Sequence, residues 1–152
     1  MKSRINPYAN LDLVKPLIDY AHTVEARLEP SLAKLIEIRA SQINGCAQCL
    51  SMHTQDARAA GETEERIMML DAWHESTLYS DRERAALGWT DALIKLAETR
   101  APDEVYAAVE AQFTEAERVN LTLMIGCINA FNLLGVGFRI RPPTRARAAA
   151  AA

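Results

Sequence analysis

The stretch SQINGCAQCLSMH at residues 41–53 combines a turn signal with three reactive side chains. Its Asn-Gly dipeptide at 44–45 is typical of turns, and it separates one apolar helical pattern from a second helix that begins near Cys46. On that second helix Cys46, Cys49 and His53 fall at i, i+3 and i+7, which places them on one face. We therefore expect a single helix to carry two thiols and an imidazole on the side that packs inward.

Helical periodicity recurs on both sides of this stretch, and almost nothing in the chain is typical of a strand. Pro16 suits the first turn of an early helix, and Gly61 suits the left-handed cap that ends the cysteine-bearing helix. Ser80 and Thr114 each begin a capping box, so each predicts the start of a further helix. The helix after Thr114 is apolar on most sides and is expected to be central. The pattern predicts an all-α fold.

The chain has 152 residues, 49% of them hydrophobic and 24% charged, which fits one globular domain. We expect this helical domain to span residues 1–143, with its core signature at 32–61, and a disordered tail over residues 144–152. The net charge of −3 argues against binding nucleic acid or an anionic membrane. With no signal peptide and no clear membrane span predicted, we expect a cytoplasmic protein.

Two of the three cysteines lie three residues apart, a pattern that favours a redox or metal site in a reducing compartment. Cys46 and Cys49 can close a disulfide within one helical turn, and the helix N-terminus favours their thiolate forms. His53, four residues after Cys49, can take the proton of that thiol. We therefore expect Cys49 to attack a peroxide and Cys46 to resolve the resulting sulfenic acid. Cys46 is also expected to be the more accessible sulfur and the point where an outside reductant enters.

A buried imidazolium needs a partner, and Glu37 on the preceding helix is the best candidate. It lies among apolar residues, where a carboxylate is costly unless it is paired. The alternative is that Glu37 points to solvent, and the sequence does not choose between these two placements.

The cysteine and histidine set has two simpler interpretations. It could be a zinc site, but zinc requires four ligands, or three and a water. The sequence contains no second CxxC, and a further ligand would have to come from a residue such as Asp56 or His22. The set could also be purely structural, as we expect for Cys127, a core thiol on the apolar C-terminal helix. We expect no metal and no bound cofactor.

Residues 41–53 resemble the core signature of the alkylhydroperoxidase D-like branch of the carboxymuconolactone decarboxylase superfamily. The Ala72-Trp73 pair, the run at 83–87 and Asn129-Ala130-Phe131-Asn132 further along the chain fit the same branch. The likeness extends over most of the chain, from about residue 32 to residue 139.

The resemblance implies an all-α homo-oligomer, a trimer or hexamer, with peroxidase activity in which the second cysteine is peroxidatic. It also implies a proton relay between a glutamate and a histidine, which corresponds here to Glu37 and His53. Two departures stand out. Lys34 occupies the position of the relay glutamate in the best-known members, and the histidine that those members carry between the cysteines is absent here.

The sequence thus predicts a thiol peroxidase that reduces small organic hydroperoxides or hydrogen peroxide, with Cys49, Cys46, His53 and Glu37 as its catalytic residues. Its electrons are expected to come from an external dithiol, either a lipoyl group or a thioredoxin-like protein. Three rival functions remain open: a general thiol-disulfide oxidoreductase, a carboxymuconolactone decarboxylase-like lyase, and a non-enzymatic oligomer that senses redox state.

Overall fold

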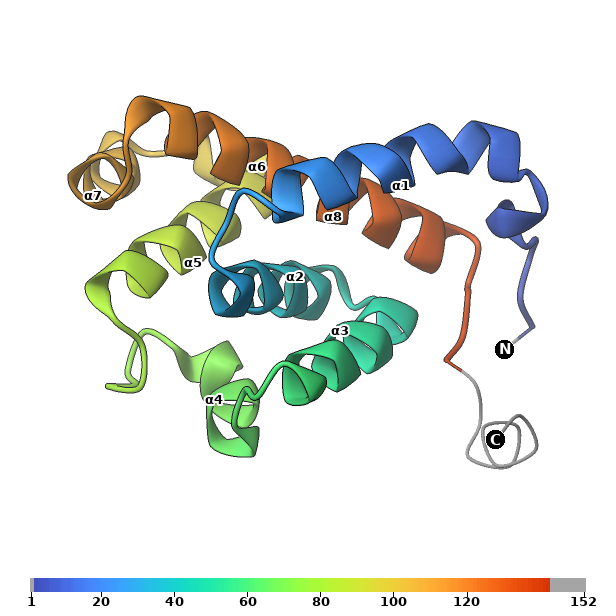
Figure 1. Ribbon diagram of the computed structural model, residues 1–152, viewed down its shortest axis with the longest axis horizontal. Coiled ribbons are helices and arrows are strands. Elements are labelled where there is room, and N and C mark those ends of the chain that lie inside the picture. Colours follow the sequence, from blue (N-terminus) through green and yellow to red (C-terminus); the bar gives the residue numbers. More distant parts are fainter. Residues whose placement is uncertain (1, 143–152) are drawn as a thin grey trace.

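The computed structural model describes residues 2–142, and over these residues the chain forms helices and no strand (Figure 1). The predicted all-α fold is confirmed, whereas the predicted tail at 144–152 lies outside the described residues. The elements are η1 (Pro7–Ala9), α1 (Leu11–Glu25), α2 (Pro30–Asn44), α3 (Ala47–Ala59), α4 (Glu64–Met69), η2 (Leu70–Ala72), α5 (Asp81–Ile94), α6 (Leu96–Thr99), α7 (Asp103–Gln112) and α8 (Glu115–Gly137).

Helix α2 lies at the centre of the bundle and packs against α3, α5 and α8 (Figure 1). Most of its side chains from Leu32 to Ser41 are buried, including Glu37 and Arg39. Arg39 is paired with Asp91 of α5 at 2.6 Å, so its charge is not left alone in the core. The helix that carries the candidate relay glutamate is therefore held on three sides.

Helix α8 is the central apolar helix that the sequence predicts. It packs against α1, α2, α3 and α5. Its length and composition would allow it to cross a membrane. It lies within the bundle, however, where 44% of its most apolar stretch is buried. Packing in the bundle accounts for part of the apolar character of α8, while Val119, Leu123, Leu133 and Val136 are exposed along it.

Both predicted capping boxes are present, at Ser80 before α5 and at Thr114 before α8. The expectation for Pro16 was wrong, because α1 begins at Leu11 and carries Pro16 in its interior. Proline lacks the N–H that would bond the carbonyl four residues earlier, which normally weakens a helix at that point. The burial of Val14 and Val24 on either side of Pro16 shows that tertiary packing holds this helix together.

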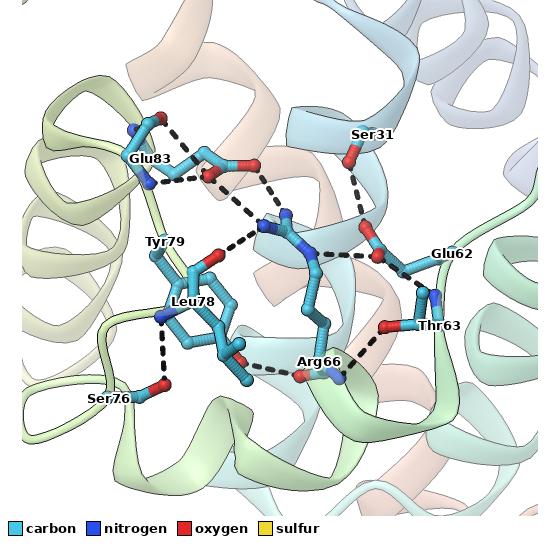
Figure 2. A network of polar contacts seen from close by, with 9 residues as sticks. Ser31, Glu62, Thr63, Arg66, Ser76, Leu78, Tyr79 and Glu83 are labelled. Carbon is cyan, nitrogen blue, oxygen red and sulfur yellow. Dashed lines mark hydrogen bonds and ion pairs between the residues drawn. The ribbon is translucent and has the colours of Figure 1, made fainter.

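A network around Arg66 fixes the end of the bundle where α3 leads into α4 (Figure 2). The Arg66 guanidinium donates to Glu62 at 2.8 Å, to Glu83 at 2.5 Å and to the carbonyl of Leu78. Glu62 also accepts a hydrogen bond from Ser31 at 2.8 Å. The network ties the C-terminal end of α3 to the starts of α2 and α5, so α3 is anchored at the end opposite its cysteines.

Candidate active site

The cysteine pair lies at the turn between α2 and α3. Gly45 ends α2 in the left-handed conformation, with φ of 66°, which costs glycine little. Cys46 is the N-cap of α3, and its sulfur accepts a hydrogen bond from the backbone N–H of Cys49 at 3.3 Å. The two cysteines form a disulfide whose Cα atoms are 5.3 Å apart. The predicted closure of a disulfide within one helical turn is thus present in the structure.

The predicted accessibility of Cys46 was wrong. Cys46 is 1% exposed and Cys49 is 5% exposed, so both sulfurs are buried and Cys46 is the more deeply covered. Helix α8 is the cause, because it passes directly over the disulfide at Gly135. A Cβ atom at Gly135 would lie 2.6 Å from Cys46 Sγ and 3.4 Å from Cys49 Sγ. Only a glycine allows this close an approach, and no feature of the sequence alone singled Gly135 out.

Three asparagines hold α8 in this position. The amide of Asn44, at the end of α2, donates to Asn129 and to Asn132, both at 3.0 Å. Asn132 in turn donates to the hydroxyl of Ser41 at 3.1 Å. The side-chain amides of Asn129 and Asn132 are thus hydrogen-bonded at the end of α2 that precedes Cys46, as polar groups in a packed interior require.

His53 and Glu37 meet in the interior, which decides between the two placements considered for Glu37. Glu37 is 6% exposed and His53 is 7% exposed. His53 Nδ1 lies 3.0 Å from Glu37 Oε2, within ion-pair distance, although the ring is turned so that this nitrogen makes no well-aligned hydrogen bond. With Nδ1 facing the carboxylate, Nε2 is the ring nitrogen left to exchange a proton with another group.

Lys34 forms ion pairs with Glu37, the partner of His53, and with Glu25. Its ammonium lies 3.1 Å from Glu37 Oε2 and 2.5 Å from Glu25 Oε1. Burial on its own would raise the pKa of Glu37, but His53 and Lys34 together hold that pKa below its ordinary value. Glu37 is therefore ionised at neutral pH. Lys34 stands out in the sequence as a departure from the family pattern, and its spacing of three residues from Glu37 on one helix is the local signal from which this pair could have been predicted.

A cavity of about 490 Å³ opens onto these groups. Cys49, His53, Glu37 and Lys34 line it, whereas Cys46 does not. Its apolar wall is formed mainly by Ile18, Ala21, Met52, Met124, Ile128 and Phe131. The remaining polar lining includes Glu25, His22, Asp56 and Gln48, and the buried Oε1 of Gln48 has no hydrogen-bond partner among the described residues. The cavity thus offers an apolar space whose wall carries the Cys49 sulfur and the His53 imidazole together.

Other candidate residues fall outside this chemistry. Cys127 is a buried thiol, as expected, and burial raises its pKa above the ordinary value, although it also lines the cavity. His74 stacks on Trp73 in a separate groove beside α5 and α7. Within residues 2–142, no group of three or more histidine, cysteine or acidic side chains is arranged to hold a metal ion.

The geometry defines an all-α protein with a CxxC disulfide beside a buried histidine–glutamate pair. Residues 12–92 match the carboxymuconolactone decarboxylase family, and the chain belongs to that family, in its alkylhydroperoxidase D-like branch. It is 40% identical to the YdfG protein of Bacillus subtilis over 124 residues, which cover 82% of this chain and 84% of YdfG.

Two solved structures share the fold. ATU0492 from Agrobacterium tumefaciens, described as a candidate antioxidant defence protein AhpD, has a TM-score of 0.89 and 40% identity, covering 95% of this chain and all of that one. The apo debrominase Bmp8 has a TM-score of 0.76 and 19% identity, covering 92% of this chain and 76% of its own. At that identity the second likeness shows the fold alone.

Proposed function

We propose that this protein is a thiol peroxidase that reduces small organic hydroperoxides or hydrogen peroxide. The observation that carries the proposal is the placement of Cys49 on the wall of a cavity that it shares with His53 and the ionised Glu37. A peroxide that enters this cavity meets a sulfur nucleophile and a proton-transfer pair together, which is the arrangement that thiol-based peroxide reduction requires. The kinship with a candidate antioxidant protein supports the same activity.

The catalytic cycle starts from the reduced pair. Nε2 of His53 takes the proton of Cys49, and the thiolate attacks the terminal peroxide oxygen. The O–O bond breaks, Cys49 becomes a sulfenic acid, and the departing alkoxide takes the proton from His53 to leave as an alcohol. Glu37 stabilises the imidazolium between these two transfers. Cys46 then attacks the Cys49 sulfur and displaces hydroxide, which is released as water after protonation, and the disulfide forms.

A mass spectrum of the reduced protein after one equivalent of an organic hydroperoxide tests this proposal. Wild type is expected to lose two hydrogens, and Cys46→Ser is expected to gain one oxygen on Cys49. Cys49→Ser should consume no peroxide. Slow, unselective oxidation of all three cysteines would overturn the proposal, and turnover of a lactone substrate by a variant without either thiol would favour the decarboxylase activity instead.

The cycle requires an external dithiol as reductant, and a reducing cytoplasm is the compartment in which we expect it to run. The two candidate donors are a folded thioredoxin-like protein and a lipoyl group. The test is to measure how fast each of the two reductants, the thioredoxin-like protein and the lipoyl group, reduces the disulfide of the same oxidised protein.

We also propose that the protein is a homo-oligomer. One side of α8 exposes Val119, Leu123, Leu133 and Val136, and apolar side chains gathered on one helix are typical of an interface. Light scattering of the oxidised and reduced protein tests this, because a monomer in both states would contradict it. A mass that changes with redox state would favour a sensing role.

A further inference from the structure

We propose that electrons return to the disulfide through Cys49, so that the same sulfur attacks the peroxide in one half of the cycle and is attacked by the reductant in the other. This inference rests on the proposed function only in requiring that the disulfide be reduced. It reverses the expectation from the sequence, in which Cys46 receives the reductant. Three features of the structure support it: a reductant can reach Cys49 through the cavity, helix α8 covers Cys46, and Cys46 is the better leaving group.

Access favours Cys49. A thiolate must reach a sulfur along the axis of the S–S bond to displace the other sulfur. Cys49 lines the cavity of about 490 Å³, together with Met52 and Phe131. Cys46 does not line this cavity, and at 1% exposure it presents almost no surface to any approaching group.

Helix α8 covers Cys46. A Cβ at Gly135 would be only 2.6 Å from its sulfur, so the helix backbone lies directly against it. The hydrogen bonds from Asn44 to Asn129 and Asn132 hold α8 to the end of α2 beside the disulfide. A reductant that attacked Cys46 would have to displace this packed helix, whereas one that attacks Cys49 would use the cavity that already exists.

The leaving group also favours attack at Cys49. When a thiolate bonds to Cys49 Sγ, the S–S bond breaks and its electron pair leaves on Cys46. Cys46 is the N-cap of α3, and its sulfur accepts the N–H of Cys49 at 3.3 Å. The partial positive charge of a helix N-terminus stabilises a thiolate there, and a more stable thiolate leaves faster. Cys46 is thus placed as the better leaving group.

The first thiolate of an external dithiol bonds to Cys49, and Cys46 departs as a thiolate that then takes a proton. The second thiolate of the same dithiol attacks the reductant's own sulfur in this mixed disulfide and releases the Cys49 thiolate. The dithiol is oxidised to a disulfide by two electrons, and the protein pair is reduced by two.

Two experiments without peroxide test the inference, so its failure is distinct from failure of the peroxidase proposal. The first uses wild-type oxidised protein and mercaptoethanol, a monothiol that cannot carry out the second exchange within the same molecule, and the reaction is sampled before a second mercaptoethanol molecule reacts. The reaction is quenched with acid, and the protein is unfolded and alkylated with N-ethylmaleimide. Cys46 and Cys49 lie in one tryptic peptide, residues 40–58, and its fragmentation shows which sulfur carries which group.

We expect mercaptoethanol on Cys49 and the maleimide on Cys46. The opposite distribution, or an even one, would overturn the inference. The second experiment compares Cys46→Ser with Cys49→Ser, both in a Cys127→Ala background, as each reacts with dithiodipyridine. The lone Cys49 should react at least about tenfold faster than the lone Cys46. In urea the two rates should converge, and equal rates in the folded proteins would contradict the inference.

Discussion

The ammonium of Lys34 lies 3.1 Å from Glu37 Oε2, the same carboxylate oxygen that lies 3.0 Å from His53 Nδ1. One carboxylate oxygen of Glu37 therefore has two partners: the Lys34 ammonium, and the His53 ring, which is cationic when protonated. In the best-known relatives a glutamate occupies the position of Lys34. In this chain the carboxylate belongs to Glu37, three residues after Lys34 on the same helix. Lys34 forms ion pairs with both Glu37 and Glu25. The proton-transfer pair of this chain is thus part of a series of four ionisable side chains: Glu25, Lys34, Glu37 and His53.

Removal of the Glu37 charge should slow peroxide reduction without unfolding the site. Glu37→Gln keeps the size of the side chain but cannot stabilise an imidazolium. We expect the kcat/KM for an organic hydroperoxide to fall by about 100-fold, in the range typical of general acid–base catalysis. Stopped-flow oxidation of the reduced protein measures this. Glu64→Gln is the control, because Glu64 is exposed and pairs with Arg58 on the surface; equal rates in the two variants would remove Glu37 from the mechanism.

Lys34→Met should shift the acidic limb of the pH profile. Lys34 helps to hold the pKa of Glu37 below its ordinary value, and without it the burial of Glu37 drives that pKa upward. Activity that requires ionised Glu37 is lost as the pH falls through its pKa. The limb of kcat/KM against pH should therefore move to higher pH in Lys34→Met.

The control for this shift is Lys15→Met, which removes an exposed lysine paired with Asp19. Its profile should coincide with that of the wild type. If Lys34→Met also leaves the limb in place while lowering the rate at every pH, Lys34 has a packing role and does not set the ionisation of Glu37.

Much of the site follows from local sequence. The spacing of Cys46, Cys49 and His53 fixes their common helix face, and the Asn-Gly turn fixes where that helix starts. These features depend on residues within one or two helical turns, so a periodic pattern is enough to predict them. The capping boxes at Ser80 and Thr114 belong to the same class, and both are present.

The rest depends on contacts between residues far apart in the chain. Gly135 covers Cys46 from a helix that begins about seventy residues later, and no local signal distinguishes it from the other glycines. The accessibility of Cys46 was mispredicted for that reason. Pro16 was misplaced because burial of Val14 and Val24 outweighs the helix-weakening effect of an internal proline. Tertiary packing decided both cases.

The asparagine contacts yield a prediction about stability. Asn132 is buried, accepts from Asn44 and donates to Ser41, so Asn132→Ala leaves the Ser41 hydroxyl without that partner. We expect a loss of about 1–3 kcal/mol in the free energy of unfolding, measured with urea. Asn129→Ala should cost less, because Asn44 can still donate to Asn132. A larger cost for Asn129→Ala would show that the hydrogen bond between Asn44 and Asn129 is the one that holds α8.

Gly135→Ala should damage the disulfide site in a way that an ordinary helix substitution does not. Replacing a helix glycine by alanine stabilises a helix by about 0.5–1 kcal/mol on its own. At Gly135 the new methyl group would lie 2.6 Å from Cys46 Sγ, a distance at which the helix or the cysteines must move. Overpacking of this kind costs about 1–3 kcal/mol, so it should outweigh the helical gain.

We therefore expect oxidised Gly135→Ala to unfold at a lower urea concentration than wild type and to turn over peroxide more slowly. Gly88→Ala is the matched control, since its methyl group would meet Trp73 at an ordinary contact distance of 3.6 Å. That variant should be at least as stable as wild type and fully active. If Gly135→Ala behaves like Gly88→Ala, then α8 has room to yield over the disulfide, and the shielding of Cys46 cannot be what directs a reductant to Cys49.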